Sequence, residues 1–182
     1  MSLTPSQMTE LGSPMPDFDL PDAQGGHVDS SRFEGQPILV AFICNHCPFV
    51  KHIADAFAEF AREYQSKGLA VVAINSNDFH NHPDDSPERM AEEAQARSYE
   101  FPYLVDESQE VARAFDAACT PDFFLFDYNH RLAYRGQFDD SRPSKDTPVT
   151  GQDLRDAADA ILNGETPDSN QTPSMGCNIK WK

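Results

Sequence analysis

Residues 38–48 read Ile-Leu-Val-Ala-Phe-Ile-Cys-Asn-His-Cys-Pro, and this stretch decides the fold. The continuous apolar run 38–43 predicts a strand that is buried on both faces of a sheet. Between Val50 and Tyr64, apolar residues recur at spacings of three and four, which predicts an amphipathic helix. A second apolar run, 69–74, predicts another buried strand. Two buried strands joined by a helix indicate a right-handed βαβ unit with parallel strands.

The rest of the chain predicts further strands and helices around this unit. Two hairpins are expected, at 18–28 and at 123–134, because turn-forming residues separate short apolar runs there. Helices are expected at 87–98, 106–118 and 151–162, and a strand at 103–105. This order predicts an α/β fold in which a mixed central sheet carries helices on both faces and an N-terminal β-hairpin.

Length and composition favour a single domain. The chain has 182 residues, and we expect one domain over 1–182, with a loosely held lead-in at about 1–12 and a C-terminal tail at about 165–182 that has no clear period. The formal net charge of −16 argues against nucleic acid and against an anionic membrane surface as partners. The N-terminus lacks the basic and apolar regions of a signal peptide, so we expect a cytoplasmic protein.

The candidate chemistry lies in a Cys-x-x-Cys motif, Cys44 to Cys47, between the first buried strand and the helix. A cysteine at a helix N-terminus meets unpaired N–H groups and the positive end of the helix dipole, which favour the thiolate. We therefore expect Cys44 to be the nucleophile and Cys47 the second, more buried sulfur. Pro48 suits the first turn of the helix, and His46 is expected to stabilise the Cys44 thiolate and raise the reduction potential.

A metal-binding or metal-delivery module remains an alternative for the same residues. Soft thiolates suit Cu(I) or Zn, with Cys44, Cys47 and His46 as ligands. However, no second Cys-x-x-Cys or His-x-x-x-His follows, as a zinc site of this type would require. The sequence therefore favours a dithiol redox site, with no metal and no cofactor, because the two sulfurs carry the electrons.

Several short motifs occur in an order that resembles a known family. The succession of residues 16–20, Gly26, 33–37 and the strand into Cys44 resembles the redoxin branch of the thioredoxin-like superfamily, which contains the alkyl hydroperoxide reductases and peroxiredoxins. Further motifs are similar to a peroxiredoxin-like subgroup, and the resemblance covers about residues 12–182; these motifs lie at 75–78, 83–88, 119–127, 134–136, 139–143 and 173–182.

The resemblance implies a thioredoxin-like fold and further site residues. It places Thr120-Pro121 opposite the cysteines, with a cis bond, so that the Thr120 backbone would capture a substrate strand by edge pairing. Cys119 and Cys177 are possible extra redox cysteines, although simple packing would also explain each. Arg135 is a candidate for lowering the thiolate pKa.

These observations predict a thiol-disulfide oxidoreductase that works through a mixed disulfide. Its expected partners are a disulfide-bearing protein or a small thiol substrate, and an external reductant. A thiol peroxidase is the alternative within enzymes. Peroxiredoxins have a Thr where this chain has Ala41, so the hydroxyl that orients peroxide is missing and we expect weak peroxidase turnover.

Overall fold

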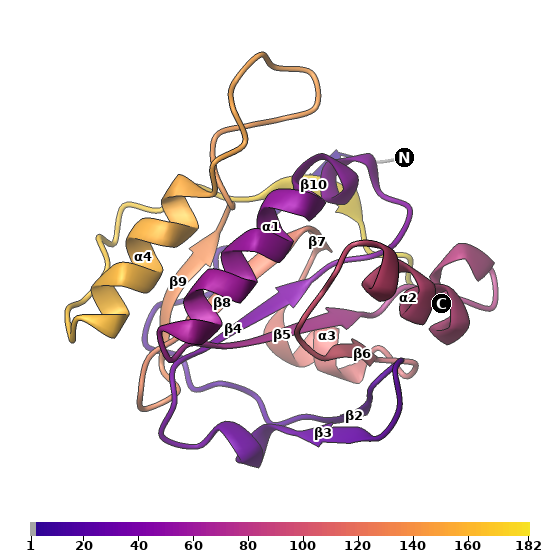
Figure 1. The fold of residues 1–182 in the computed structure, drawn as a ribbon, viewed down its shortest axis with the longest axis horizontal. Coiled ribbons are helices and arrows are strands. Elements are labelled where there is room, and N and C mark those ends of the chain that lie inside the picture. Colours follow the sequence, from indigo (N-terminus) through magenta and orange to yellow (C-terminus); the bar gives the residue numbers. More distant parts are fainter. Residues whose placement is uncertain (1–2) are drawn as a thin grey trace.

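A mixed five-stranded sheet forms the centre of the computed structural model, which describes residues 3–182 (Figure 1). Its strands are β4 (Ile38–Phe42), β5 (Ala70–Asn75), β6 (Tyr103–Val105), β8 (Asp122–Phe126) and β9 (Leu132–Gly136). They lie in the order β6-β5-β4-β8-β9. β4 pairs in parallel with β5 and antiparallel with β8. The predicted βαβ unit and the mixed sheet are therefore confirmed.

Helices cover both faces of this sheet. Alternate side chains of β4 therefore pack into two different hydrophobic cores, one on each face. The helices are α1 (Pro48–Ser66), α2 (Pro87–Ala96), α3 (Glu110–Phe115) and α4 (Gln152–Leu162), with short 3-10 turns η1 (Ser30–Phe33) and η2 (Pro83–Asp85). Leu39 and Ala41 pack with residues of α1, α2 and α4. Val40 and Phe42 pack with residues of α3. Within residues 3–182, no helix has the length and apolar character needed to cross a membrane.

Two smaller sheets flank the central one. The predicted N-terminal hairpin is confirmed as β2 (Asp19–Pro21) paired with β3 (His27–Asp29). A three-stranded sheet joins β1 (Leu3–Pro5), β10 (Met175–Asn178) and β7 (Cys119–Thr120), in the order β1-β10-β7.

This three-stranded sheet shows that the expectation of a loosely held lead-in and an irregular C-terminal tail is wrong. Cys177 of β10 lies opposite Leu3 on one side and opposite Thr120 on the other. The pairing joins segments from opposite ends of the chain, so no local pattern could reveal it. The first two residues of the expected lead-in lie outside the described residues.

We expect Phe57→Ala to cost about 3–5 kcal/mol of unfolding free energy. The Phe57 ring lies in the core between α1 and the sheet, with its centroid 5.3 Å from Phe101, 5.5 Å from Phe123 and 6.2 Å from Phe138. Its loss leaves a cavity that these rings cannot fill without shifting. Urea unfolding measures the change. Tyr128→Ala, at a side chain 46% exposed, is the control and should stay within about 0.5 kcal/mol of the wild type.

Candidate active site

The Cys-x-x-Cys motif lies in the short connection between β4 and α1. α1 begins at Pro48, and Cys47 is its N-cap residue with an extended backbone. The expectation that Cys44 meets the helix N-terminus is therefore wrong, because Pro48 takes the first helical position and Cys47, not Cys44, is the residue that precedes it. The expected contrast in burial is also absent, since Cys44 and Cys47 are each 4% exposed.

Hydrogen bonds that favour a thiolate converge on Cys47. The Cys44 thiol donates to the Cys47 sulfur, and so do the Cys177 thiol and the amide of Val50. Against the cost of burial, these donors lower the pKa of Cys47 to about 5. The pKa of Cys44 is raised well above its ordinary value, first by its hydrogen bond to Cys47 and then by burial and the charge of Asp85. Within the pair, these contacts favour the thiolate form at Cys47 and the thiol form at Cys44.

Thr120 and Pro121 lie against both sulfurs, and the predicted cis bond between them is confirmed. The Thr120 hydroxyl lies 3.4 Å from the Cys44 sulfur. In its thiol form, Cys47 donates to the Thr120 carbonyl oxygen at 3.4 Å. The expected free edge for substrate pairing is not present, however, because β10 pairs with β7 at this point and places Cys177 opposite Thr120.

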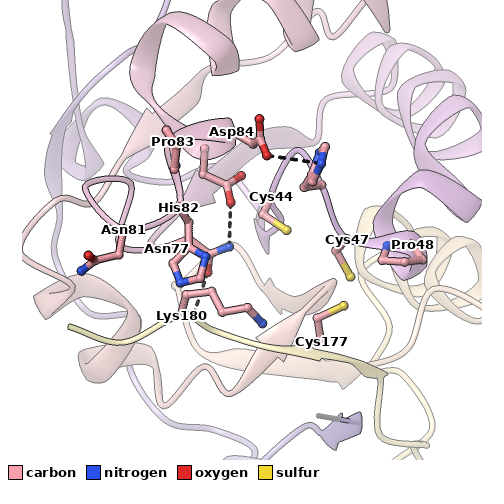
Figure 2. A pocket seen from close by; sticks show the side chains of 12 residues that line it. Cys44, Cys47, Pro48, Asn77, Asn81, His82, Pro83, Asp84, Cys177 and Lys180 are labelled. Atoms are coloured by element: carbon pink, nitrogen blue, oxygen red, sulfur yellow. Dashed lines mark hydrogen bonds and ion pairs between the residues drawn. The ribbon is translucent and has the colours of Figure 1, made fainter. Parts of the chain in front are cut away.

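A cavity of about 370 Å³ opens beside the cysteines (Figure 2). Three cysteines line it, together with Pro48 and polar residues from the segment 77–85 and the C-terminal tail. The members of this lining are Cys44, His46, Cys47, Pro48, Asn77, Asn81, His82, Pro83, Asp84, Asp85, Cys177 and Lys180. Cys177, one of the two extra cysteines singled out in the sequence, is therefore brought to the site.

Asp85 holds the loop between the two cysteines, a role that the sequence did not suggest. Its carboxylate is buried and accepts from the Asn45 amide at 2.8 Å and from the Asn75 side chain at 3.0 Å. Its second oxygen accepts from the Asn77 side chain at 3.0 Å. Asp85 thus ties the Cys44–Cys47 loop to the wall of the cavity. The motif at 83–88 is the signal in the sequence that points to this segment as part of the family resemblance.

His46 and Arg135 do not have the roles expected of them. The His46 side chain is 64% exposed, and its Nε2 lies 3.3 Å from a carboxylate oxygen of Asp84. Arg135 lies on β9 and does not line the cavity; its guanidinium donates to the Thr9 carbonyl at 2.7 Å and to Gln171 at 2.8 Å. Neither side chain therefore stabilises a thiolate through a contact of the described structure.

Cys119 is buried apart from the cavity. It is fully shielded from solvent, and its thiol contacts the Pro121 carbonyl oxygen at 3.6 Å. Burial, with the charge of Asp122, raises the pKa of Cys119 far above its ordinary value. The structure thus assigns Cys119 to packing.

The described residues add no support for the metal alternative. Among residues 3–182, no group of three or more His, Cys, Asp or Glu side chains is arranged to hold a metal ion. His46, which that hypothesis named beside the two cysteines, pairs instead with Asp84.

Solved structures define the class of this fold. A protein from Sinorhizobium meliloti is 53% identical, with a TM-score of 0.96 over 98% of this chain and 98% of that chain. The thioredoxin domain of a thiol-disulfide oxidoreductase from Bacteroides vulgatus is 16% identical, with a TM-score of 0.60 over 70% of this chain and 89% of that chain. The predicted thioredoxin-like fold is therefore confirmed.

The chain belongs to the AhpC/TSA family, whose model matches residues 11–135. This confirms the resemblance to the redoxin branch. Peroxiredoxin Q from Suaeda salsa is 29% identical over 70% of this chain and 60% of its own length. The thiol-disulfide oxidoreductase ResA from Geobacillus kaustophilus is 27% identical over 65% of this chain and 64% of its own length. The chain thus spans less than two thirds of the length of these curated relatives.

Alkylation should identify Cys47 as the reactive thiolate. Only the thiolate reacts with iodoacetamide, so the rate at Cys47 should rise through a midpoint near pH 5, while Cys44 stays unlabelled until alkaline pH. Peptide sequencing by mass spectrometry after limiting alkylation at pH 6 locates the label. Preferential labelling of Cys44 would restore the assignment drawn from the sequence.

Asp122, directly after the cis proline, should make stability depend on pH. It is fully buried, and burial raises its pKa to about 7, although the Ser6 hydroxyl donates to it at 2.9 Å. Between about pH 4 and 7 the unfolded chain is ionised at this residue while the folded protein keeps the proton. The stability of the wild type relative to Asp122→Asn should therefore fall as pH rises across this window and level off above it. Urea unfolding at a series of pH values measures the difference, and a constant difference would contradict the assignment.

Proposed function

We propose that the protein is a thiol-disulfide oxidoreductase that uses Cys44 and Cys47. The observation that carries this proposal is the placement of the Cys44 and Cys47 sulfurs together at the wall of a cavity, where the Cys44 thiol donates to the Cys47 sulfur and lowers its pKa. A thiolate next to a second thiol is the arrangement that thiol-disulfide exchange requires. The similarity to the ResA oxidoreductase supports the same reaction.

In this proposal the roles of the two cysteines are reversed relative to the expectation from the sequence. The Cys47 thiolate attacks one sulfur of the substrate, forms a mixed disulfide and releases the other sulfur as a thiolate, which takes up a proton. The Cys44 thiol then loses its proton to the departing substrate sulfur as its own sulfur attacks Cys47. The substrate leaves as two thiols, and Cys44 and Cys47 are left as a disulfide. An external dithiol reductant regenerates them, so no cofactor takes part.

The substrate that we propose is a low-molecular-weight disulfide, in the cytoplasm. A cavity of about 370 Å³ has the volume of a small-molecule site. A protein substrate would need an extended segment to pair beside Thr120, and β10 already pairs there. Of the two partners expected from the sequence, this favours the small substrate over the disulfide-bearing protein.

A thiol peroxidase is the second candidate, favoured by the similarity to peroxiredoxin Q. The Cys47 thiolate would attack one peroxide oxygen and become a sulfenic acid while the other oxygen leaves as water or an alcohol. A neighbouring thiol would then displace water and form the disulfide. Ala41, buried in β4, offers no hydroxyl to this reaction.

Turnover assays with matched variants test the proposal. With oxidised glutathione as the small disulfide and dithiothreitol as the reductant, Cys47→Ser should lower the catalysed rate at least ~100-fold, because the attacking sulfur is lost. Cys119→Ala, which changes a cysteine outside the cavity, should keep the wild-type rate. Equal rates for Cys47→Ser and the wild type would refute the proposal. A rate constant above ~10⁵ M⁻¹s⁻¹ with hydrogen peroxide would favour the peroxidase.

A further inference from the structure

Strand β10 occupies the backbone edge beside the two cysteines. Cys177 lies opposite Thr120, the residue whose carbonyl faces Cys47 and whose hydroxyl faces Cys44. The approach is close, since a Cβ atom on Gly176 would lie 2.0 Å from the Thr120 carbonyl oxygen. Only glycine permits this contact. The position in which an extended peptide would offer a cysteine to Cys47 is therefore filled by this chain's own residues.

The Cys177 side chain is directed at Cys47. It is 5% exposed and lines the same cavity. Its thiol donates to the Cys47 sulfur, and its backbone amide also bonds that sulfur. Figure 2 shows the sulfurs of Cys47 and Cys177 pointing toward each other. Cys47 therefore has a thiol on either side, Cys44 from its own loop and Cys177 from β10.

We propose that Cys177 is a second resolving cysteine, which competes with Cys44 for the mixed disulfide on Cys47. This rests on the proposed function. In the step, the Cys177 sulfur bonds to the Cys47 sulfur, and the bond between Cys47 and the substrate sulfur breaks. The Cys177 proton goes to the departing substrate thiolate. The substrate disulfide is thereby reduced to two thiols, and Cys47 and Cys177 are oxidised to a disulfide.

The loss of the negative charge on Cys47 favours the thiolate form of Cys177, which this step needs. In the reduced protein, burial and the neighbouring Cys47 thiolate raise the pKa of Cys177 to about 12. Once Cys47 carries a mixed disulfide, its negative charge is gone. The Phe49 amide and the ammonium group of Lys180, both of which favour a Cys177 thiolate, remain. Cys177 is thus kept as a thiol at rest and becomes more acidic when it has a disulfide to attack.

The linkage can be mapped directly in the wild type. The protein is oxidised with excess oxidised glutathione, blocked with N-ethylmaleimide and digested with trypsin without reduction. Cleavage after Arg32, Lys51, Arg155 and Lys180 puts Cys44 and Cys47 together in peptide 33–51 and Cys177 in peptide 156–180. We expect a covalent adduct of these two peptides. Peptide 114–131, which carries Cys119, should stay unlinked and serves as the internal control.

The Cys44→Ser variant isolates the step. After the same oxidation it should hold one free thiol, Cys119, and no bound glutathione, because Cys177 has released it. The matched Cys44→Ser/Cys177→Ser variant should retain glutathione on Cys47. If the Cys44→Ser variant keeps glutathione on Cys47 and its Cys177 thiol stays free, then Cys177 is not a resolving cysteine. That result would still agree with the proposed attack by Cys47 on the substrate. Three free thiols and no adduct would overturn that attack as well, and with it the proposed function.

Should Cys44→Ser fail to fold by circular dichroism, an absence of the 33–51/156–180 adduct from the oxidised wild type overturns the proposal.

Discussion

Helix α1 begins at Pro48, and this single boundary places Cys47 and its sulfur at the N-terminus of the helix. The amide of Val50 and two neighbouring thiols then stabilise the same sulfur as a thiolate. Had the helix begun at Cys44, the preference for the thiolate form would pass from Cys47 to Cys44. The buried strand β4 fixes where the loop starts, and Asp85 fixes its middle through the amide of Asn45. The chemistry of the pair thus depends on how β4, α1 and Asp85 constrain the five-residue loop 43–47.

The second constraint is the pairing of β10 with β7. It converts the C-terminal tail from a surface segment into one wall of the cavity and supplies Cys177 and Lys180 to it. The same pairing closes the edge at which an extended polypeptide would dock. Access to Cys47 is therefore by way of a small cavity, whose lining includes Asn77, Asn81 and His82. In the function that we propose, the tail thus takes part in both the choice of substrate and the supply of thiols.

The sequence predicted the elements with strong local patterns and failed where partners lie far apart. β4, α1 and β5 carry continuous or periodic apolar residues, and their predicted positions agree with the structure within a few residues. The β1–β10–β7 sheet has no such pattern, because each short strand is defined by its partners. The role of His46 was wrongly predicted for a related reason. His46 is adjacent to Cys47 in the sequence, but its side chain pairs with Asp84, and the position of Asp84 depends on the fold of another loop.

The pairing of β1 with β10 also has a practical consequence. Leu3 lies opposite Cys177, so the N-terminal end of the described chain lies about one strand spacing, ~5 Å, from the backbone of a candidate redox cysteine. A protein or affinity tag fused at that end would be attached to the strand that pairs with β10. The N-terminus is therefore a poor position for a tag in assays that follow Cys177, whereas the C-terminal Lys182 lies beside Gln109, away from this pairing.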